Sequence, residues 1–268
     1  MAGAVAAGVD GSRESRAAAD WAAREAVRRE VPLRLVNCWG LASPLASLRA
    51  GAEPAGSLRL LGGVRLELLA GYPGLEIETE SRTGGPVHAL TEAAGAAELL
   101  VLGSRGLGQL TGFLLGSVSL PVVARAGRPV VVVRPEGNWT EASGLAVVVG
   151  VGRPDPEVLD FAFRAAAVRG LGLRAVRVTP REDGRPAPGE LASVLRPLRD
   201  AYPDTRVAEE AVTGSPGQVL TEAAASAELV VVGRGGHRSG FGPRVGPVVH
   251  ALLHHAPCPV AVVPPAEG

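Results

Sequence analysis

The sequence predicts an α/β fold with a parallel sheet, built twice in tandem. Three observations support this fold class. Short strands that are apolar at every position, such as VVVV at 130–133, alternate with helical patterns, which indicates strands that helices bury on both faces. The apolar residues are mostly Ala, Val and Leu, with only 3% aromatic residues, and small side chains let helices pack closely on a sheet. An internal repeat covers both halves of the chain.

The internal repeat sets the expected domain boundaries. Residues 83–106 align without a gap with residues 213–236, and the N-terminal strands of the two halves also correspond. Each copy is long enough to hold its own core. We therefore predict two domains, 1–135 and 144–268, joined by a linker at 136–143.

Strands and helices alternate in a regular order within the first copy. Ser12 is the expected N-cap of the first helix, whose apolar stripe includes Trp21 and Ala22. The charged residues of this helix, Glu25 among them, are expected on a solvated face. The expected strands are 4–9, 33–39, 75–81, 98–103 and 129–134, and the expected helices lie near 58–70, 86–97 and 117–126. Ligands of such folds bind beyond the carboxyl ends of the strands, where Asp10 stands.

The glycine-rich loop between Gly103 and Ser119 predicts a phosphate site. Two residues separate Gly103 from Gly106, and nine more precede Gly116 and Ser117, which begin a helix. Glycine lets the backbone approach a ligand, and the first N–H groups and hydroxyls of the helix offer neutral donors to an anion. The loop has neither the lysine of a Walker A motif nor a G-x-G-x-x-G fingerprint. A flexible surface connection is the alternative on these residues alone.

Three segments together resemble the ATP-binding branch of the universal stress protein family: GVDGS at 8–12, GSRGLGQLTGFLLGSVS at 103–119 and RPVVVVR at 128–134. The motif of that family is Gly, two residues, Gly, nine residues, then Gly-Ser/Thr, and residues 103–117 match it in full. The resemblance covers both domains. It implies a Rossmann-like fold of the adenine nucleotide alpha hydrolase type, with a five-stranded parallel sheet in the order 3-2-1-4-5 and helices on both faces.

The resemblance also implies which residues bind the ligand. Asp10 matches the aspartate that faces the adenosine, although on its own it also suits a turn before glycine. Cys38 lies where the second strand bonds the adenine edge through its backbone. The residues that match the segment around the ribose and phosphates are Gly103, Arg105, Gly106, Gly116, Ser117, Val118 and Ser119. The implied ligand is ATP, with Mg²⁺ as an optional companion ion, while AMP and cyclic nucleotides stay open.

The second copy departs from the motif at two positions. Gly152 stands where the first copy has Asp10, and Pro247 replaces Ser117, which removes a hydroxyl and a backbone N–H. The glycines that it keeps are Gly233, Gly236 and Gly246. The charged side chains that would partly compensate are Arg234, His237, Arg238 and Arg244. The sequence therefore predicts one competent nucleotide site, in the first domain, and a weak or empty second site.

Composition excludes several other classes of protein. The charges balance at 27 basic and 27 acidic residues, which gives no support for a nucleic-acid partner. No apolar run approaches the roughly 20 residues that span a bilayer, so we expect a cytoplasmic protein without membrane contact. Cys38 and Cys258 are expected to be buried free thiols. His250, His254 and Cys258 are spaced by four, but prolines follow, so helix-end contacts with carbonyls are favoured over a metal site.

These observations predict a nucleotide-dependent sensor or regulator of stress response, acting on a regulatory protein partner that the sequence does not name. The strands at 129–134 and 258–264 would be apolar edges of their sheets. The resemblance implies that the two copies pair along them as a pseudo-dimer, and we also expect a homodimer. Two alternatives stay open. One is a slow ATP hydrolase or nucleotidyl transferase, for which no base is evident, and the other is an interaction scaffold without nucleotide.

Overall fold

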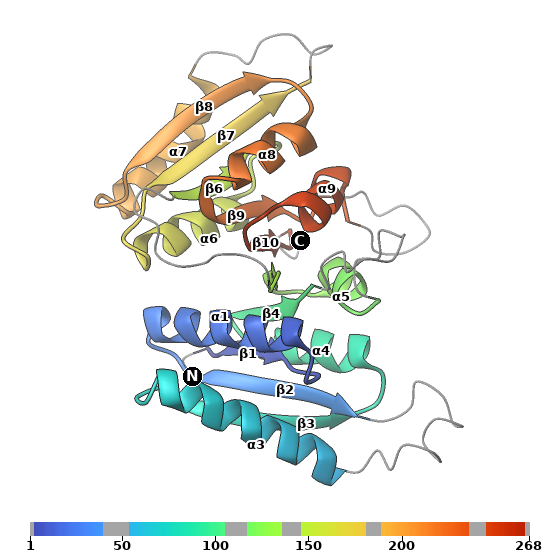
Figure 1. Ribbon diagram of the computed structural model, residues 1–268. Coiled ribbons are helices and arrows are strands. Elements are labelled where there is room, and N and C mark those ends of the chain that lie inside the picture. The colour runs from blue at the N-terminus through green and yellow to red at the C-terminus, as the bar shows by residue number, and fades with distance from the viewer. Residues whose placement is uncertain are drawn as a thin grey trace. The chain divides into compact units, whose positions relative to one another are not determined.

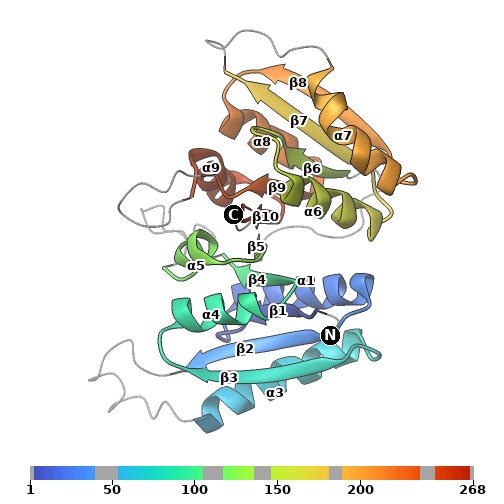
Figure 2. The ribbon, with the colours of Figure 1, turned by 180° about the vertical axis from the view of Figure 1, so that it is seen from behind.

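The structure is a computed structural model that describes residues 3–39, 54–104, 117–135, 146–180, 189–235 and 245–265. The chain divides into two compact units, residues 1–136 and 137–268. Both units are layered α/β structures with helices on both faces of a sheet (Figures 1 and 2).

The first unit holds five parallel strands in the order β3-β2-β1-β4-β5. The strands are β1 (Val5–Gly8), β2 (Leu33–Trp39), β3 (Ile77–Thr83), β4 (Leu99–Gly103) and β5 (Val130–Val133). The helices are α1 (Arg13–Arg29), α3 (Pro54–Gly71), α4 (Pro86–Gly95) and α5 (Ser119–Arg125). Helices α1 and α3 contact each other on one face, and α4 and α5 contact each other on the opposite face. The predicted strand order and the helical cover of both faces are confirmed.

The second unit repeats this topology, with parallel strands in the order β8-β7-β6-β9-β10. The strands are β6 (Ala146–Gly150), β7 (Leu173–Thr179), β8 (Val207–Thr213), β9 (Ala227–Gly233) and β10 (Val260–Val263). The helices are α6 (Pro156–Ala167), α7 (Glu190–Ala201), α8 (Pro216–Ala224) and α9 (Pro247–His255). The internal sequence repeat is therefore a structural repeat.

The strands of the first sheet differ in burial according to their position. Every side chain of β1 and β5 is buried, and so are four of the five in β4. The edge strand β3 is different, because only Ile77 is buried and Glu78, Glu80 and Arg82 follow at alternate positions. Side chains two residues apart lie on the same face of a strand, so β3 carries a charged row on one face. Charged side chains on an edge strand discourage pairing with another chain.

Helix α1 confirms one sequence expectation and corrects another. Ser12 is its N-cap, and the Ser12 hydroxyl accepts a hydrogen bond from the Ser15 N–H at 3.1 Å. Glu25, expected on a solvated face, is instead 1% exposed. Its carboxylate is 2.7 Å from the Arg29 guanidinium, and a buried carboxylate needs such a partner. Glu25 stands four residues after Trp21, so helical periodicity itself places it on the buried stripe.

In both units, a tyrosine that follows the end of a helix donates a hydrogen bond to an aspartate. The Tyr72 hydroxyl donates to Asp20 at 3.0 Å, and the Tyr202 hydroxyl donates to Asp160 at 3.0 Å. Burial, with the charge and the hydrogen bond of Asp20, raises the pKa of Tyr72 to about 12. Burial and the hydrogen bond to Asp160 also raise the pKa of Tyr202 above its usual value.

Titration of the two tyrosines tests this arrangement, because the chain has no others. We expect phenolate absorbance to show both pKa values above the usual value of about 10, with Tyr72 near 12. Because the folded-state pKa of Tyr72 is raised, its stabilisation is complete below about pH 10 and is lost as the pH rises through the folded pKa. Asp20→Asn should lower the pKa of Tyr72, whereas Asp160→Asn should leave it unchanged. Two phenols that titrate near pH 10 while circular dichroism still reports folded protein would contradict the contacts.

Candidate functional site

A cavity of about 260 Å³ lies at the carboxyl ends of β1, β2 and β4 in the first unit. Strand β1 stands between β2 and β4, and the helices that follow β1 and β3 cover opposite faces of the sheet. The cavity therefore lies at the switch point of strand order, where parallel α/β sheets bind ligands. Its apolar wall includes Val36, Leu90 and Leu102.

Six of the nine predicted site residues line this cavity: Asp10, Cys38, Gly103, Ser117, Val118 and Ser119. The other three, Arg105, Gly106 and Gly116, lie outside the described residues. The six come from the loop after β1, from β2, and from the two ends of the glycine-rich segment. The fold thus brings together segments that are far apart in the sequence.

Asp10 is held in place by the turn that begins α1. Its carboxylate accepts hydrogen bonds from both the N–H and the hydroxyl of Ser12, and its own N–H donates to the Ser15 hydroxyl at 3.2 Å. This is the turn that Asp-Gly suggested. The same carboxylate group is exposed and belongs to a cavity-lining residue, so the turn and the site are compatible functions of one residue.

Asn37 is a polar residue of this region that the sequence reasoning missed. Its side-chain amide donates to the Val9 carbonyl at 2.6 Å, and Asn37 is 7% exposed. Because Val9 directly precedes Asp10, this bond fixes the chain where it leaves β1. The available signal was an amide that directly follows the apolar residues Leu35 and Val36 within a strand, because a buried amide needs hydrogen-bond partners.

Gly103 serves packing within the protein in addition to lining the cavity. A Cβ atom at Gly103 would lie 2.5 Å from the backbone carbonyl of Glu14. The missing side chain therefore lets the first turn of α1 lie against the end of β4. The Gly103 carbonyl also accepts a hydrogen bond from the Ser119 hydroxyl at 3.0 Å.

Helix α5 begins at Ser119, two residues later than expected, and Ser117 and Val118 form a turn. The Ser119 hydroxyl ties this helix start to β4, so that hydroxyl proton is already used inside the protein. The helix has only seven residues, so few peptide dipoles add to its field. The neutral groups left to face an anion are mainly those of the Ser117–Val118 turn.

The Cys38 thiol stays protonated under ordinary conditions. Burial raises its pKa above the usual value, the Arg82 guanidinium opposes this in part, and the Glu80 carboxylate adds to it. Cys38 is half-buried, and Cys258 is buried. Because the thiolate is the reactive form, Cys38 is suited to lining the cavity rather than to acting as a nucleophile.

The second unit uses the corresponding positions differently. Gly152 follows β6 and supplies no carboxylate, while Asp155 caps α6 by accepting from the Glu157 N–H at 3.0 Å. Pro247 is the first residue of α9, where proline is well tolerated. The helix survives as predicted. The predicted residues Gly236, His237, Arg238 and Arg244 lie outside the described ranges.

Helix α9 carries the two histidines that are spaced by four residues. The His250 and His254 rings have centroids 4.3 Å apart on α9. Within the ranges that the structure describes, no group of three or more His, Cys, Asp or Glu side chains could hold a metal ion. In the same ranges, no helix is both long enough and apolar enough to span a membrane.

The fold and the site together define a class of protein: a tandem α/β protein with a cavity at the switch point of its first sheet. The model of the universal stress protein family matches residues 1–134 and 146–264. A universal stress protein of Mycobacterium tuberculosis is 34% identical over an alignment of 282 positions, gaps included, and the alignment covers 96% of each chain. The chain belongs to the universal stress protein family.

Comparison with solved structures shows that the fold is shared. The crystal structure of a universal stress protein from Archaeoglobus fulgidus matches with a TM-score of 0.75 at 19% identity, covering 97% of this chain and 98% of that chain. A universal stress protein crystallised in complex with cAMP is 30% identical and covers 50% of this chain and 97% of its own, with a TM-score of 0.39.

The packing role of Gly103 can be tested by adding one methyl group. Gly103→Ala should lower the free energy of unfolding in urea by about 3 kcal/mol, because the methyl group meets backbone that cannot move aside easily. Gly62→Ala is the matched control, since a Cβ there meets nothing within 4 Å on α3. This control should be neutral or stabilising by up to about 1 kcal/mol. Equal effects of the two substitutions would refute the packing role.

The charges around Cys38 can be tested by alkylation with iodoacetamide in a Cys258→Ser background. At pH 8 the folded protein should react more slowly than the urea-unfolded protein, because the raised pKa leaves less thiolate. Glu80→Gln should speed the reaction and Arg82→Val should slow it, as the signs of the two charges require. Mass spectrometry monitors the reaction. If the folded protein reacts faster than the unfolded protein, the pKa of Cys38 is not raised.

Proposed function

We propose that the first unit binds an adenine nucleotide, ATP, and that the protein is a cytoplasmic, nucleotide-dependent sensor or regulator of stress response. One observation carries this proposal. The six predicted site residues that the structure describes, from three separate segments, line a single cavity at the switch point of the sheet. A flexible surface connection would give no reason for the loop ends to meet Asp10 and Cys38.

The lining of the cavity suits the parts of a nucleotide. Val36, Leu90 and Leu102 offer an apolar surface of the kind that nucleobase rings occupy. Asp10 offers an acceptor for ribose hydroxyls. The turn at Ser117 and Val118 offers neutral donors for phosphate oxygens.

Charge favours a nucleotide that arrives with a cation. Among the described lining residues, the charged ones are Asp10 and Glu14, both carboxylates. A free triphosphate would meet these negative charges without compensation there. Carboxylate and hydroxyl oxygens suit Mg²⁺, which would neutralise phosphate charge, and Arg105 is a second cation that the motif provides. The magnesium complex of ATP is therefore the ligand form that we propose.

The second unit is proposed to be a degenerate copy with a weak or empty site. It has lost the carboxylate of Asp10 to Gly152 and the hydroxyl and N–H of Ser117 to Pro247. We further propose that the units, with the boundaries that the repeat suggests, pair along β5 and β10, because an apolar edge strand favours pairing. A homodimer and a regulatory protein partner, recognised according to the bound nucleotide, complete the proposal.

Isothermal titration calorimetry with magnesium ATP tests the site directly. We expect one ATP per chain, and Asp10→Ala should weaken binding by about tenfold or more, because a charged hydrogen-bond acceptor is lost. Ser117→Pro introduces the residue that the second unit has at this position, and it should also weaken ATP binding. Pro247→Ala is the matched control and should leave binding unchanged. Two equal sites per chain would overturn the proposed asymmetry.

The same preparations separate the alternatives. Mass spectrometry of nucleotide released from freshly purified protein distinguishes ATP from AMP or a cyclic nucleotide. Steady release of ADP or AMP that disappears in Asp10→Ala would favour a slow hydrolase. No change of melting temperature at millimolar ATP would favour a scaffold without nucleotide, since a ligand that binds the folded state raises that temperature.

A further inference from the structure

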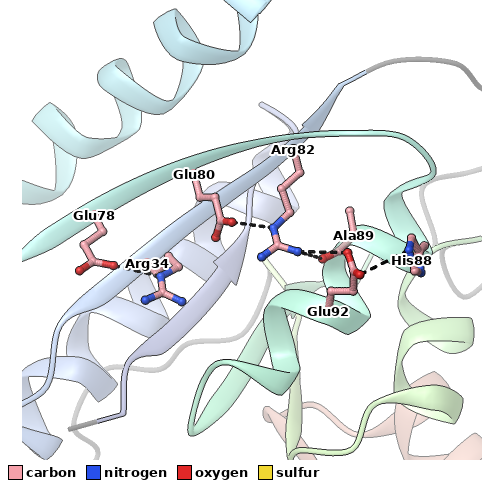
Figure 3. Close-up of polar contacts among 7 residues, drawn as sticks. All are labelled: Arg34, Glu78, Glu80, Arg82, His88, Ala89 and Glu92. Atoms are coloured by element: carbon pink, nitrogen blue, oxygen red, sulfur yellow. Dashed lines mark hydrogen bonds and ion pairs between the residues drawn. The ribbon is translucent and has the colours of Figure 1, made fainter. Parts of the chain in front are cut away.

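Arg82 joins the edge strand β3 to helix α4 (Figure 3). Its Nε atom donates to Glu80 at 2.7 Å, and its Nη1 atom donates to Glu92 at 3.3 Å and to the Ala89 carbonyl at 3.5 Å. Glu92 also lies 3.5 Å from His88 on the same helix. Arg82 thus forms contacts that connect the carboxyl end of a strand with the helix that follows it.

The helix that Arg82 holds is a wall of the proposed nucleotide site. Pro86 and Leu90 of α4 line the cavity, and Cys38 lines it from β2. Arg82 is the register partner of Cys38 on the neighbouring strand, and its charge reaches the thiol, whose pKa it lowers against the larger effect of burial. The guanidinium therefore contacts the helix that forms one wall of the cavity and acts by its charge on Cys38 in another wall, although Arg82 is not among the described lining residues.

The connection that precedes α4 is anchored by one backbone hydrogen bond, from the Gly84 N–H to the Trp39 carbonyl at 3.2 Å. Gly84 has a φ of 107°, and the N-cap residue Gly85 makes no side-chain hydrogen bond to the first turn. Two successive glycines permit many backbone conformations. The charge-assisted link from Arg82 to Glu92 adds a restraint within the helix itself, beyond the anchor at Gly84.

The second unit provides a natural comparison within the same chain. Glu210 and Glu222 are the counterparts of Glu80 and Glu92, but Val212 stands in the place of Arg82. There Arg174 donates to Glu210 at 2.8 Å, which lowers the pKa of that carboxyl, and Gln218 donates to Glu222 at 3.0 Å. The unit that lacks the counterpart of Asp10 also lacks this cation.

We propose that Arg82 is a positioning residue of the nucleotide site, one that selects for the base. It holds the part of α4 that carries Pro86 and Leu90 against the end of β3, so that this wall of the cavity keeps one arrangement toward the base. The inference rests on the proposed function of the same cavity. Its distinct content is that a residue outside the cavity sets the preference for adenine.

Arg34 offers a matched control for this inference. Its side chain is 25% exposed, against 24% for Arg82, and it bonds Glu78 at 3.0 Å across β2 and β3 (Figure 3). Arg34→Val removes the same charge and similar packing from the same pair of strands. It leaves the contact between β3 and α4 in place.

The experiment measures the affinities of magnesium ATP and magnesium GTP by calorimetry for the full chain and its variants. Arg82→Val should raise the Kd for ATP about tenfold, as the loss of one charge-assisted contact would, and should reduce the ratio between the GTP and ATP constants. Arg82→Lys keeps the charge but loses the forked pair of donors, so its Kd for ATP should lie between those of the wild type and Arg82→Val. Arg34→Val should change neither the ATP constant nor the ratio.

Glu92→Gln guards against a variant that simply fails to fold, because Glu92 is exposed. Glu92→Gln should reduce the ratio between the GTP and ATP dissociation constants, as Arg82→Val does. The double variant should have the same Kd for ATP as Arg82→Val alone. If the wild type binds neither nucleotide, the proposed function fails. If the wild type binds ATP but Arg82→Val keeps the wild-type ratio, the role of Arg82 is refuted while the proposed function stands.

Discussion

Burial of the central strands on both faces is the constraint on which the rest of the structure depends. Strands β1, β4 and β5 have almost no exposed side chains, so polar chemistry cannot sit on the faces of the sheet there. It moves to the strand ends, where backbone groups and loop residues meet water. Because the helices after β1 and β3 leave on opposite faces, a gap forms at one of these ends, and the cavity occupies it.

The internal repeat separates what the fold needs from what the site needs. Both copies have the contact between a tyrosine and an aspartate. Both also pair an arginine near the end of the first helix with a glutamate at the start of the fourth strand, Arg29 with Glu98 and Arg169 with Glu228. Among the residues that differ are three at the cavity or beside it: Asp10, Ser117 and Arg82 have the counterparts Gly152, Pro247 and Val212. The contacts that hold the fold together therefore occur in both copies, while these three side chains occur in one.

The sequence was enough to predict the helical cover of a parallel sheet, because this follows from the apolar periodicity. The strand order and the convergence of Asp10 and Cys38 were predicted from the resemblance to a family, which the motif with fixed spacing carries. The sequence was not enough for features that arise only when distant segments meet. The packing of Gly103 against Glu14 and the bond from Ser119 to Gly103 depend on α1, β4 and α5 being in place. Glu25 is the exception, since its position along the helix already indicated burial.

The protonated state of Cys38 has a consequence for chemistry that a stressed cell produces. Peroxide and related oxidants attack the thiolate, and the first product is a sulfenic acid that can progress to irreversible forms. Burial raises the pKa of the Cys38 thiol and so lowers its thiolate fraction, and we therefore expect these oxidants to attack it slowly. A thiol that lines the proposed site can therefore remain chemically unchanged while oxidants modify more acidic cysteines elsewhere.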